Sequence, residues 1–361
     1  MTPFGVYLHI PFCAARCDYC SFATWTDRHH LTEPYLAACR ADADRLVADG
    51  MPAATSIFVG GGTPSMVTAE DLVAVLARIP RAAEGAGGCE VTVECNPDNV
   101  TAELIDTYLA GGVNRLSFGV QSTSAHVLVA LGRTHDRANV VQSVELARAA
   151  GVPSFNLDVI YGGVTETLED WCQTLDDVVA LDPPHVSAYA LTVEAGTPLA
   201  ADTARHPDDD DQADKYLAAV ERLGGAGYES YEISNWARPG HECRHNLLYW
   251  TMGEYQGIGC AAHSHRDGRR FWNLRTPDRY LDAVTTGATV EAGDERLDAD
   301  ARLLESLQLS LRTTHGVPRG ALDPDDLPGL VAPHPDDPER LVLTTDGRLL
   351  ANEVALRLRA P

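Results

Sequence analysis

The stretch Tyr7-Leu-His-Ile-Pro-Phe-Cys-Ala-Ala-Arg-Cys-Asp-Tyr-Cys-Ser-Phe22 places Cys13, Cys17 and Cys20 directly after a strand-like run. This Cys-x3-Cys-x2-Cys spacing suits a [4Fe-4S] cluster in which three irons bind thiolates and the fourth iron has no protein ligand. An iron with an open coordination position can bind a small molecule and take part in chemistry. The spacing therefore predicts a metal centre on these three cysteines.

Two simpler interpretations of the cysteines stay open on spacing alone. The first is a zinc knuckle with His9 or a distant residue as the fourth ligand, and the second is three unrelated thiols. Zinc sites more often combine a Cys-x2-Cys pair with a second pair far away in the sequence. No such pair exists among the other cysteines, Cys39, Cys89, Cys95, Cys172, Cys243 and Cys260.

Composition limits the class of protein further. Nine cysteines, an odd number in a sequence without a signal peptide, argue against a disulfide framework and predict a cytoplasmic location. No run approaches the ~18 to 20 consecutive apolar residues of a membrane span, so we expect no integral membrane segment, and peripheral membrane contact stays open. The formal net charge of -24 at pH 7 repels phosphate backbones and argues against nucleic acid as a partner.

Strand-like and helical segments alternate over about 230 residues. Because parallel strands joined by crossover helices produce this alternation, it predicts an α/β fold that closes as a partial or full β/α barrel. The predicted strands are 6–10, 56–59, 90–94, 115–120, 155–161, 186–193 and 228–233, and the predicted helices are 31–47, 69–79, 101–109, 137–150, 168–181 and 211–223.

Glycines and polar residues stand where these strands end, namely the three cysteines, the loop 60–65, Glu94, Gln121 and Asp158. Since barrel enzymes gather functional groups at the C-terminal ends of their strands, we expect these residues to meet on one rim. Each has a simpler explanation, as a tight turn, as a partner for nearby backbone groups or, for Arg133, as a surface cation. Together they offer carboxylates for ribose hydroxyls and a cation for a carboxylate, which predicts a site for an amino-acid nucleoside.

The ordered segments resemble the radical S-adenosylmethionine (radical SAM) family related to oxygen-independent coproporphyrinogen III oxidase, and especially its heme-chaperone branch, HemW. The resemblance runs from about residue 4 to the end of the chain. It is carried by the cysteine motif with Tyr7 and His9 and by residues 60–65, 115–122, 156–162, 231–236 and 245–250.

The resemblance implies a partial (β/α)6 barrel with a [4Fe-4S] cluster on the three cysteines and S-adenosylmethionine on the open iron. It places Tyr7 beside the cluster, and the methionine amino group against the backbone of Gly61, Gly62 and Thr63. It also pairs Arg133 with the carboxylate, and it assigns the ribose region to Glu94, Gln121 and Asp158. We assign no residue a catalytic role.

Two features separate the chaperone branch from the oxidase branch. In the oxidase the motif continues to a fourth cysteine two residues beyond the third, whereas this chain has Phe22 there. The oxidase also carries an N-terminal arm ahead of the cysteines, and here Cys13 is twelve residues from the start. Coproporphyrinogen oxidase activity is therefore not expected, while cleavage of S-adenosylmethionine stays open.

The segment Cys243-Arg-His-Asn-Leu-Leu-Tyr-Trp250 contains a histidine with flanking aromatic residues. Such a histidine can give an axial nitrogen to heme iron, although a lone histidine near aromatic residues is more often a hydrogen-bonded core residue. The match to the HemW-like pattern His-Asn-x-x-Tyr-Trp implies that His245 binds heme. Nearby competitors for this role are His241, Cys243, His263 and His265.

The end of the chain has a different character. Residues 302–311 predict an amphipathic helix, and residues 323–339 predict a loop rich in proline and aspartate. Residues 341–352 predict a strand, an Asp-Gly turn and a helix. Together these elements fit a small α+β, winged-helix-like appendage. We expect three parts, a radical SAM barrel over 1–240, a heme-binding and connecting region over 241–290, and a C-terminal domain over 291–361.

Three hypotheses about function follow. The first is a cytoplasmic heme chaperone that binds heme and passes it to acceptor proteins, with the cluster and S-adenosylmethionine regulating or powering that step. The second is a radical enzyme that acts on coproporphyrinogen III or a related tetrapyrrole. The third is a degenerate scaffold that keeps its cluster only for structure.

Overall fold

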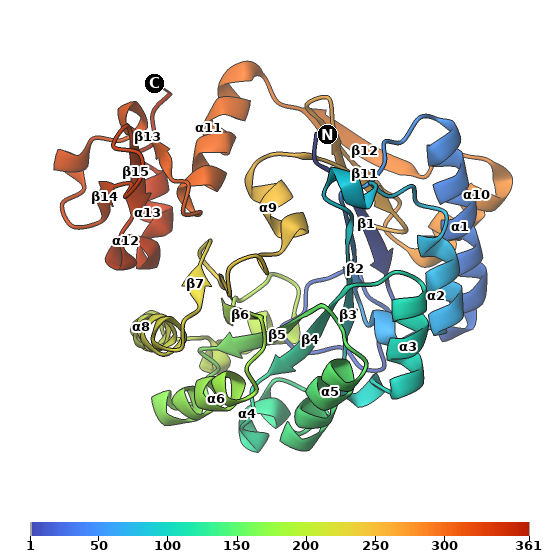
Figure 1. The fold of residues 1–361 in the computed structure, drawn as a ribbon, viewed down its shortest axis with the longest axis horizontal. Coiled ribbons are helices and arrows are strands. Elements are labelled where there is room, and N and C mark those ends of the chain that lie inside the picture. Colours follow the sequence, from blue (N-terminus) through green and yellow to red (C-terminus); the bar gives the residue numbers. More distant parts are fainter. Residues whose placement is uncertain (1, 361) are drawn as a thin grey trace.

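The computed structural model describes residues 2–360 and contains a curved sheet of twelve strands (Figure 1). Six parallel strands occupy its centre in sequence order, which confirms the predicted partial (β/α)6 barrel. They are β1 Phe4–Ile10, β2 Ser56–Gly61, β3 Glu90–Cys95, β4 Arg115–Gln121, β5 Ser154–Tyr161 and β6 His185–Ala190.

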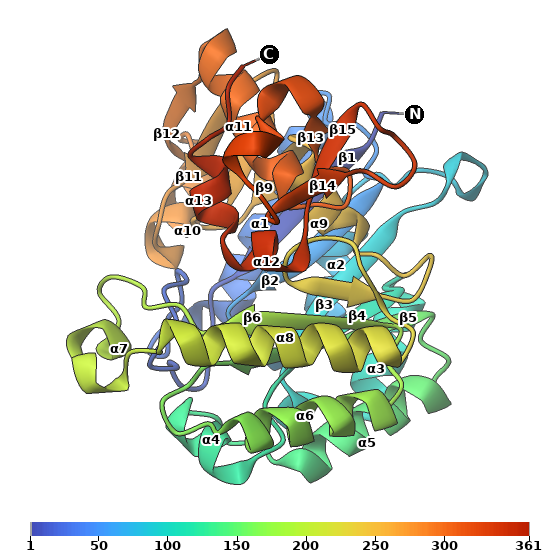
Figure 2. The ribbon, with the colours of Figure 1, turned by 90° about the vertical axis from the view of Figure 1, so that its left-hand side faces the viewer.

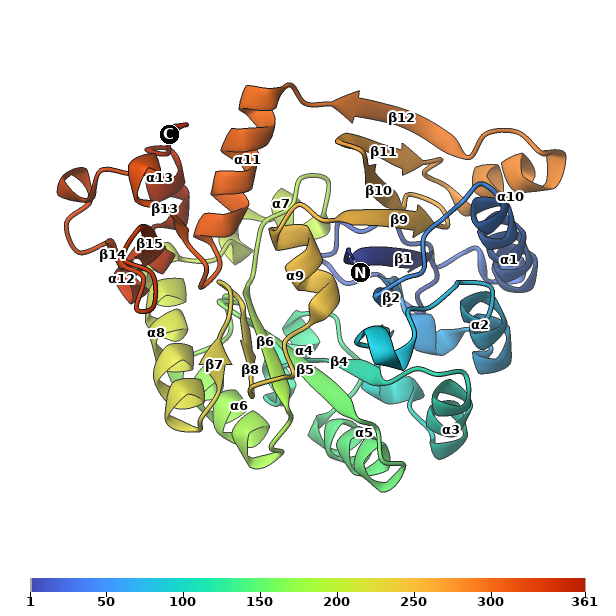
Figure 3. The ribbon, with the colours of Figure 1, turned by 45° about the horizontal axis from the view of Figure 1, so that its top comes forward.

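Helices cover the outer face of this arc (Figure 3). They pack against it because alternate strand residues, such as Val6, Leu8 and Ile10 of β1, are apolar, buried and directed outward. The outer helices are α1 Thr32–Ala48, α2 Ala69–Leu76, α3 Ala102–Ala110, α4 Ala125–Ala130, α5 Arg137–Ala149, α6 Leu168–Ala180 and α8 Asp209–Gly225, with the short α7 Pro198–Ala201 before α8.

The sheet continues on both sides of the predicted barrel. Beyond β6 it ends in a short antiparallel pair, β8 Asn235–Ala237 and β7 Glu229–Ser230, where the sequence had predicted a longer strand over 228–233. Beyond β1 it continues through β9 Glu254–Ile258, which is parallel to β1, and the antiparallel strands β10 His263–Arg266, β11 Arg269–Asn273 and β12 Glu291–Arg296. The α10 helix, Pro277–Thr286, packs beside α1.

The inner, concave face of the arc is polar and aromatic rather than apolar. On β1 it carries Tyr7 and His9, the residues that alternate with the outward apolar ones. The short helix α9, Arg244–Trp250, lies within the arc, near the beginnings of β1 and β2 (Figure 3). Its His245 bonds to Ser56 at the start of β2, which places α9 at the end of the barrel opposite the cysteines.

The C-terminal residues form a small α+β unit with its own apolar core, on the side of the barrel next to α8 (Figure 2). The predicted helix over 302–311 is confirmed as part of α11 Ala299–Leu311. The predicted Asp-Gly turn is wrong, because Asp346 and Gly347 lie inside α12, which the Thr344 side chain caps. The other elements are β13 Val317–Pro318, β14 Val331–Pro333, β15 Arg340–Leu343, α12 Thr345–Leu349 and α13 Ala351–Ala355.

Candidate functional site

The cysteine loop leaves β1 and returns to it. The Trp25 N–H donates to the Pro11 carbonyl (2.7 Å), and the Cys13 N–H donates to the Trp25 carbonyl (3.2 Å), which closes the base of the loop. Within the loop, the Cys20 N–H donates to the Cys17 carbonyl (3.1 Å). All three cysteines are free thiols of intermediate exposure. The loop is therefore ordered by its own backbone while its thiols stay accessible.

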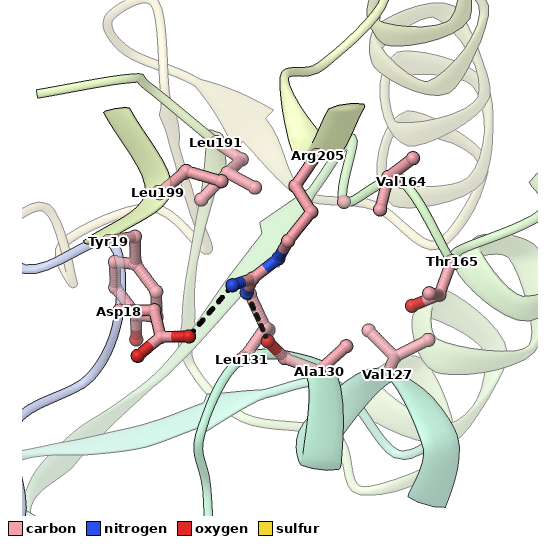
Figure 4. A pocket seen from close by; sticks show the side chains of 11 residues that line it. Asp18, Tyr19, Val127, Ala130, Leu131, Val164, Thr165, Leu191, Leu199 and Arg205 are labelled. Carbon is pink, nitrogen blue, oxygen red and sulfur yellow. Dashed lines mark hydrogen bonds and ion pairs between the residues drawn. The ribbon is translucent and has the colours of Figure 1, made fainter. Parts of the chain in front are cut away.

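A second contact holds the outer part of the loop. The Leu199 N–H, in α7, donates to the Asp18 carbonyl (3.1 Å), and the Arg205 guanidinium pairs with the Asp18 carboxylate (2.9 Å). Figure 4 shows Arg205 crossing the adjacent pocket to reach Asp18 and the Ala130 carbonyl. This pocket includes none of the residues predicted to bind S-adenosylmethionine. It lies where the cysteine loop, residues 127–131, residues 163–165 and residues 191–205 meet.

The glycine loop lies against the end of β1. The N–H groups of Gly62 and Thr63 donate to the carbonyls of Ile10 (2.7 Å) and Phe12 (2.8 Å). Gly61 has a φ of +109°, and a Cβ there would lie 2.3 Å from the His9 ring, so only glycine fits. Because these amide protons are already used, Gly62 and Thr63 have no backbone N–H left to donate to an anionic ligand.

His9 connects this region to Tyr7 and to the cysteine loop. Its Nε2 lies 2.9 Å from the Ala23 carbonyl, so it carries the proton, and Nδ1 accepts from the Tyr7 hydroxyl at 3.1 Å. Burial lowers the pKa of His9 to about 4, which keeps the imidazole neutral. Both nitrogens are occupied, so His9 has none left for a zinc ion. Residues 2–360 contain no group of three His, Cys, Asp or Glu side chains placed to hold a single metal ion.

Glu94 and Asp158 face each other across the inner rim. Burial, followed by the charge of Asp158, raises the pKa of Glu94 to about 8, although the Gly61 N–H donates to its carboxylate (3.2 Å). Burial also raises the pKa of Asp158, which accepts from Ser117 (2.6 Å) and Asn156 (2.8 Å). Glu94 is therefore the less satisfied carboxyl group and the one that gains more from a cationic or hydroxyl-bearing ligand.

Arg133 brings an unneutralised positive charge to the same rim. Its Nη2 donates to the Asn96 side chain (3.1 Å) and to the Gly119 carbonyl (2.9 Å), and Nη1 lies 4.0 Å from Cys17 Sγ. No carboxylate of residues 2–360 lies within ion-pair distance of it, and its buried Nε has no partner. A guanidinium held by neutral acceptors suits a carboxylate ligand.

Gln121 completes this group in a strained backbone conformation. Its φ of +64° follows a register shift between β4 and β5, a conformation that costs a non-glycine residue about 1 kcal/mol or more. A Cβ on Gly119 would lie 2.9 Å from Gln121 Nε2 and 3.4 Å from Arg133 Nη2, so both side chains gather over this glycine. The expected meeting of the strand ends on one rim is what the geometry shows.

His245 lies elsewhere and is fully buried. Its Nδ1 is 3.0 Å from the Ser56 hydroxyl, and its Nε2 is 2.8 Å from the Tyr249 hydroxyl. The N–H groups of Arg244 and His245 donate to the Glu90 carboxylate (3.2 and 3.1 Å), which caps α9. Burial lowers the pKa of His245 to about 3. In this conformation both ring nitrogens serve the packing of α9.

A network of polar residues on the inner face was not singled out from the sequence. Asn156 is its centre: it bonds to Ser117 (2.7 Å), to His185 (2.7 Å) and to Ser187 (3.2 Å). His185 continues the network to the Tyr231 hydroxyl (2.8 Å). Alternation of polar and apolar residues along β4, β5 and β6 was the available signal. The network fixes the position of the Asp158 carboxylate, because both Asn156 and Ser117 donate to it.

The fold and this rim define a radical SAM protein, and the radical SAM superfamily is matched over residues 7–178. The chain is 40% identical to a heme chaperone HemW of Mycobacterium tuberculosis over 99% of this chain and 95% of that protein. It is 39% identical to the HemW of Escherichia coli over 82% and 80% of the two chains. The chain therefore belongs to the HemW family of heme chaperones.

A solved structure supports the fold. Coproporphyrinogen III oxidase (HemN) from Escherichia coli superimposes with a TM-score of 0.84 over 98% of this chain and 89% of that one, at 22% sequence identity. At that identity the similarity concerns the fold, and the arrangement of the barrel and its C-terminal unit is shared. No helix within residues 2–360 is both long enough and apolar enough to cross a membrane.

Proposed function

We propose that the protein is a heme chaperone that holds a [4Fe-4S] cluster on Cys13, Cys17 and Cys20. The observation that carries the proposal is the position of three accessible thiols on a doubly anchored loop, beside a cation, Arg133, that has no carboxylate partner among residues 2–360. In a [4Fe-4S] cluster each thiolate binds a different iron, so the ligands need not converge on one point as they do around zinc. Three thiolates leave one iron open.

The rim fits S-adenosylmethionine on that iron. The backbone of Gly61, Gly62 and Thr63 is assigned to the amino group, and Arg133 offers its charge to the carboxylate. Glu94, Gln121 and Asp158 are assigned to the ribose region, and Tyr7, stacked on Phe58 with ring centroids 6.5 Å apart, is assigned a place beside the cluster. When bound, such a cluster would be able to supply an electron to S-adenosylmethionine.

Heme is the proposed cargo, and proteins that accept heme are the proposed partners, in the cytoplasm. The concave face offers aromatic surface for a porphyrin, since Tyr249 and Tyr255 meet edge to face with centroids 4.7 Å apart. His245 stays a predicted heme ligand, but this role requires its bond to Tyr249 to break. We also propose that the chain divides into three parts, a radical SAM barrel over 1–240, a heme-binding and connecting region over 241–290, and a C-terminal domain over 291–361.

The radical oxidase is the second candidate. Its fold is shared, yet the position of the oxidase's fourth cysteine holds Phe22, whose side chain is 64% exposed beside the cysteine loop. A phenyl group cannot replace a thiolate.

The discriminating experiment uses anaerobically reconstituted protein. One sample receives heme, and a parallel sample receives coproporphyrinogen III, S-adenosylmethionine and a reductant. We expect a Soret band from protein-bound heme and no protoporphyrinogen by chromatography. Steady formation of protoporphyrinogen would favour the oxidase, and absence of both signals would leave the degenerate scaffold.

A further inference from the structure

Three polar side chains stand side by side at one level of the barrel. Ser117 of β4 pairs with Asn156 of β5, and Asn156 pairs with His185 of β6. Because β4, β5 and β6 are neighbouring parallel strands (Figure 3), these partners share one face of the sheet. Asp158 lies two residues beyond Asn156 on the same face, one step closer to the C-terminal rim. The row therefore lies next to the carboxylate that is assigned to the ribose.

The hydrogen bonds of Asn156 fix the direction in which its amide points. Its Nδ2 donates to Asp158 (2.8 Å) and to Ser117 (2.7 Å), and its Oδ1 accepts from Ser187 (3.2 Å). A flipped amide would place its oxygen against the Asp158 carboxylate, where two acceptors repel each other. Oδ1 therefore faces His185, whose Nδ1 lies 2.7 Å away and must carry the proton.

Tyr231 fixes the same tautomer of His185 from the other side of the ring. Burial lowers the pKa of His185 well below its usual value, so the ring is neutral and holds one proton. Since Nδ1 carries that proton, Nε2 accepts from the Tyr231 hydroxyl at 2.8 Å. The Tyr231 oxygen in turn accepts from the Cys243 N–H (3.3 Å) at the start of α9.

The donors of this chain of groups all point the same way. Each group from Cys243 to Asn156 donates to the next, and the last donation reaches the Asp158 carboxylate. Hydrogen bonds in such a series polarise one another, so each one strengthens its neighbours.

From this arrangement we infer that His185 and Tyr231 are positioning residues for the binding of S-adenosylmethionine. They hold the Asn156 amide in one orientation, and the amide holds the Asp158 carboxylate ready for the ribose hydroxyls. The inference rests on the proposed binding of S-adenosylmethionine at this rim and deepens it.

The test measures the Kd of S-adenosylmethionine by calorimetry on full-length, cluster-loaded protein. His185→Phe keeps an aromatic ring but removes both nitrogen atoms, and we expect it to raise the Kd about tenfold. His185→Asn returns an N–H donor near the position of Nδ1 and should restore most of the affinity. Tyr231→Phe should raise the Kd about threefold. The matched control is Tyr228→Phe, which removes a buried hydroxyl that donates to the Pro183 carbonyl (2.7 Å) and should bind normally.

A second measurement separates positioning from a general loss of packing. In protein that already carries Asp158→Ala, His185→Phe should cause no further loss of affinity, because its effect reaches the ligand through the Asp158 carboxylate. In protein that carries Arg133→Ala the two losses should multiply, since Arg133 is assigned to the ligand's carboxylate rather than to its ribose.

The outcomes keep the inference apart from the proposed function. If the parent binds no S-adenosylmethionine, its proposed binding fails and the inference falls with it. If the parent binds it and folded His185→Phe binds it equally well, only the inference is overturned. Should His185→Phe not fold, Tyr231→Phe decides, and an affinity equal to that of Tyr228→Phe overturns the inference. A loss of the same size in the Asp158→Ala protein shows an effect of packing and also overturns it.

Discussion

The Tyr249 hydroxyl lies 2.8 Å from Nε2 of His245, one turn earlier on the same helix. This bond joins the histidine and the tyrosine of the His-Asn-x-x-Tyr-Trp motif inside the protein. The motif therefore stabilises the position of α9 within the arc before any ligand is present.

Removing that bond should lower stability. Tyr249→Phe leaves a buried imidazole nitrogen without a partner and should reduce the free energy of unfolding by about 1 kcal/mol, and His245→Ala, which also strands Ser56, by about 2 kcal/mol or more. Urea unfolding followed by fluorescence measures both. Unfolding midpoints equal to the parent for both variants would show that the bonds contribute nothing.

The cluster prediction concerns the three rim cysteines. Cys17→Ser should abolish the brown anaerobic chromophore and the bound iron and sulfide, because an open-iron cluster has only three protein thiolates. Cys89→Ser and Cys172→Ser should retain them. Unaltered iron in Cys17→Ser, or zinc in place of iron in the parent, contradicts the assignment.

Arg133 should control affinity for S-adenosylmethionine. Arg133→Ala removes a charge-assisted pair with the ligand carboxylate and should weaken binding about tenfold to a hundredfold, or ~1.4 to 2.7 kcal/mol, with the cluster retained. Calorimetry measures the change. Arg137→Ala, which loses only its surface pair with Asp177, is the matched control and should bind normally. Equal affinities for the two variants refute the role of Arg133.

Glu94 should make the ligand-free protein less stable as pH rises. Its pKa is about 8 in the folded protein against an ordinary 4.5, so the folded state binds this proton more tightly than the unfolded chain does. The free energy of unfolding should therefore decrease between pH ~4.5 and 8. Glu94→Gln should remove this decrease, and should be more stable than the parent at pH 8 by about 1 kcal/mol or more.

Urea unfolding at pH 5 and pH 8 provides the measurement for Glu94. Exposed Glu221→Gln should keep the parent's pH dependence. The Glu94→Gln variant should also bind S-adenosylmethionine more weakly, so stability and binding move in opposite directions. Identical pH profiles for Glu94→Gln and the parent show that the carboxyl group is ionised normally.

The barrel and its rim were predictable because parallel strands bring their ends together. Glu94 and Gln121 stand at such ends and Asp158 lies within β5, and alternating apolar residues identified the strands that carry them. The sheet beyond β1 was not predictable in this way. Its last strand, Glu291–Arg296, reads Glu-Ala-Gly-Asp-Glu-Arg and has no apolar pattern. It is fixed by pairing with β11, and two ion pairs of Arg269, to Glu291 and Asp294, support it.

The burial of His245 could not be predicted from the sequence either. The sequence pattern of a histidine beside aromatic residues is the same whether the side chain faces a ligand or a neighbouring strand. Only the return of α9 to the start of β2, with Glu90 capping its first turn, shows which environment it occupies.

Gel filtration of cluster-loaded protein mixed with heme shows whether the protein carries heme without transforming a porphyrinogen. We expect heme to elute with the protein, with a histidine-ligated Soret spectrum and undiminished cluster iron, and we expect coproporphyrinogen III supplied instead to be recovered unchanged. Heme that elutes only with the small molecules, or steady conversion of coproporphyrinogen III, would rule out the proposed heme-chaperone function.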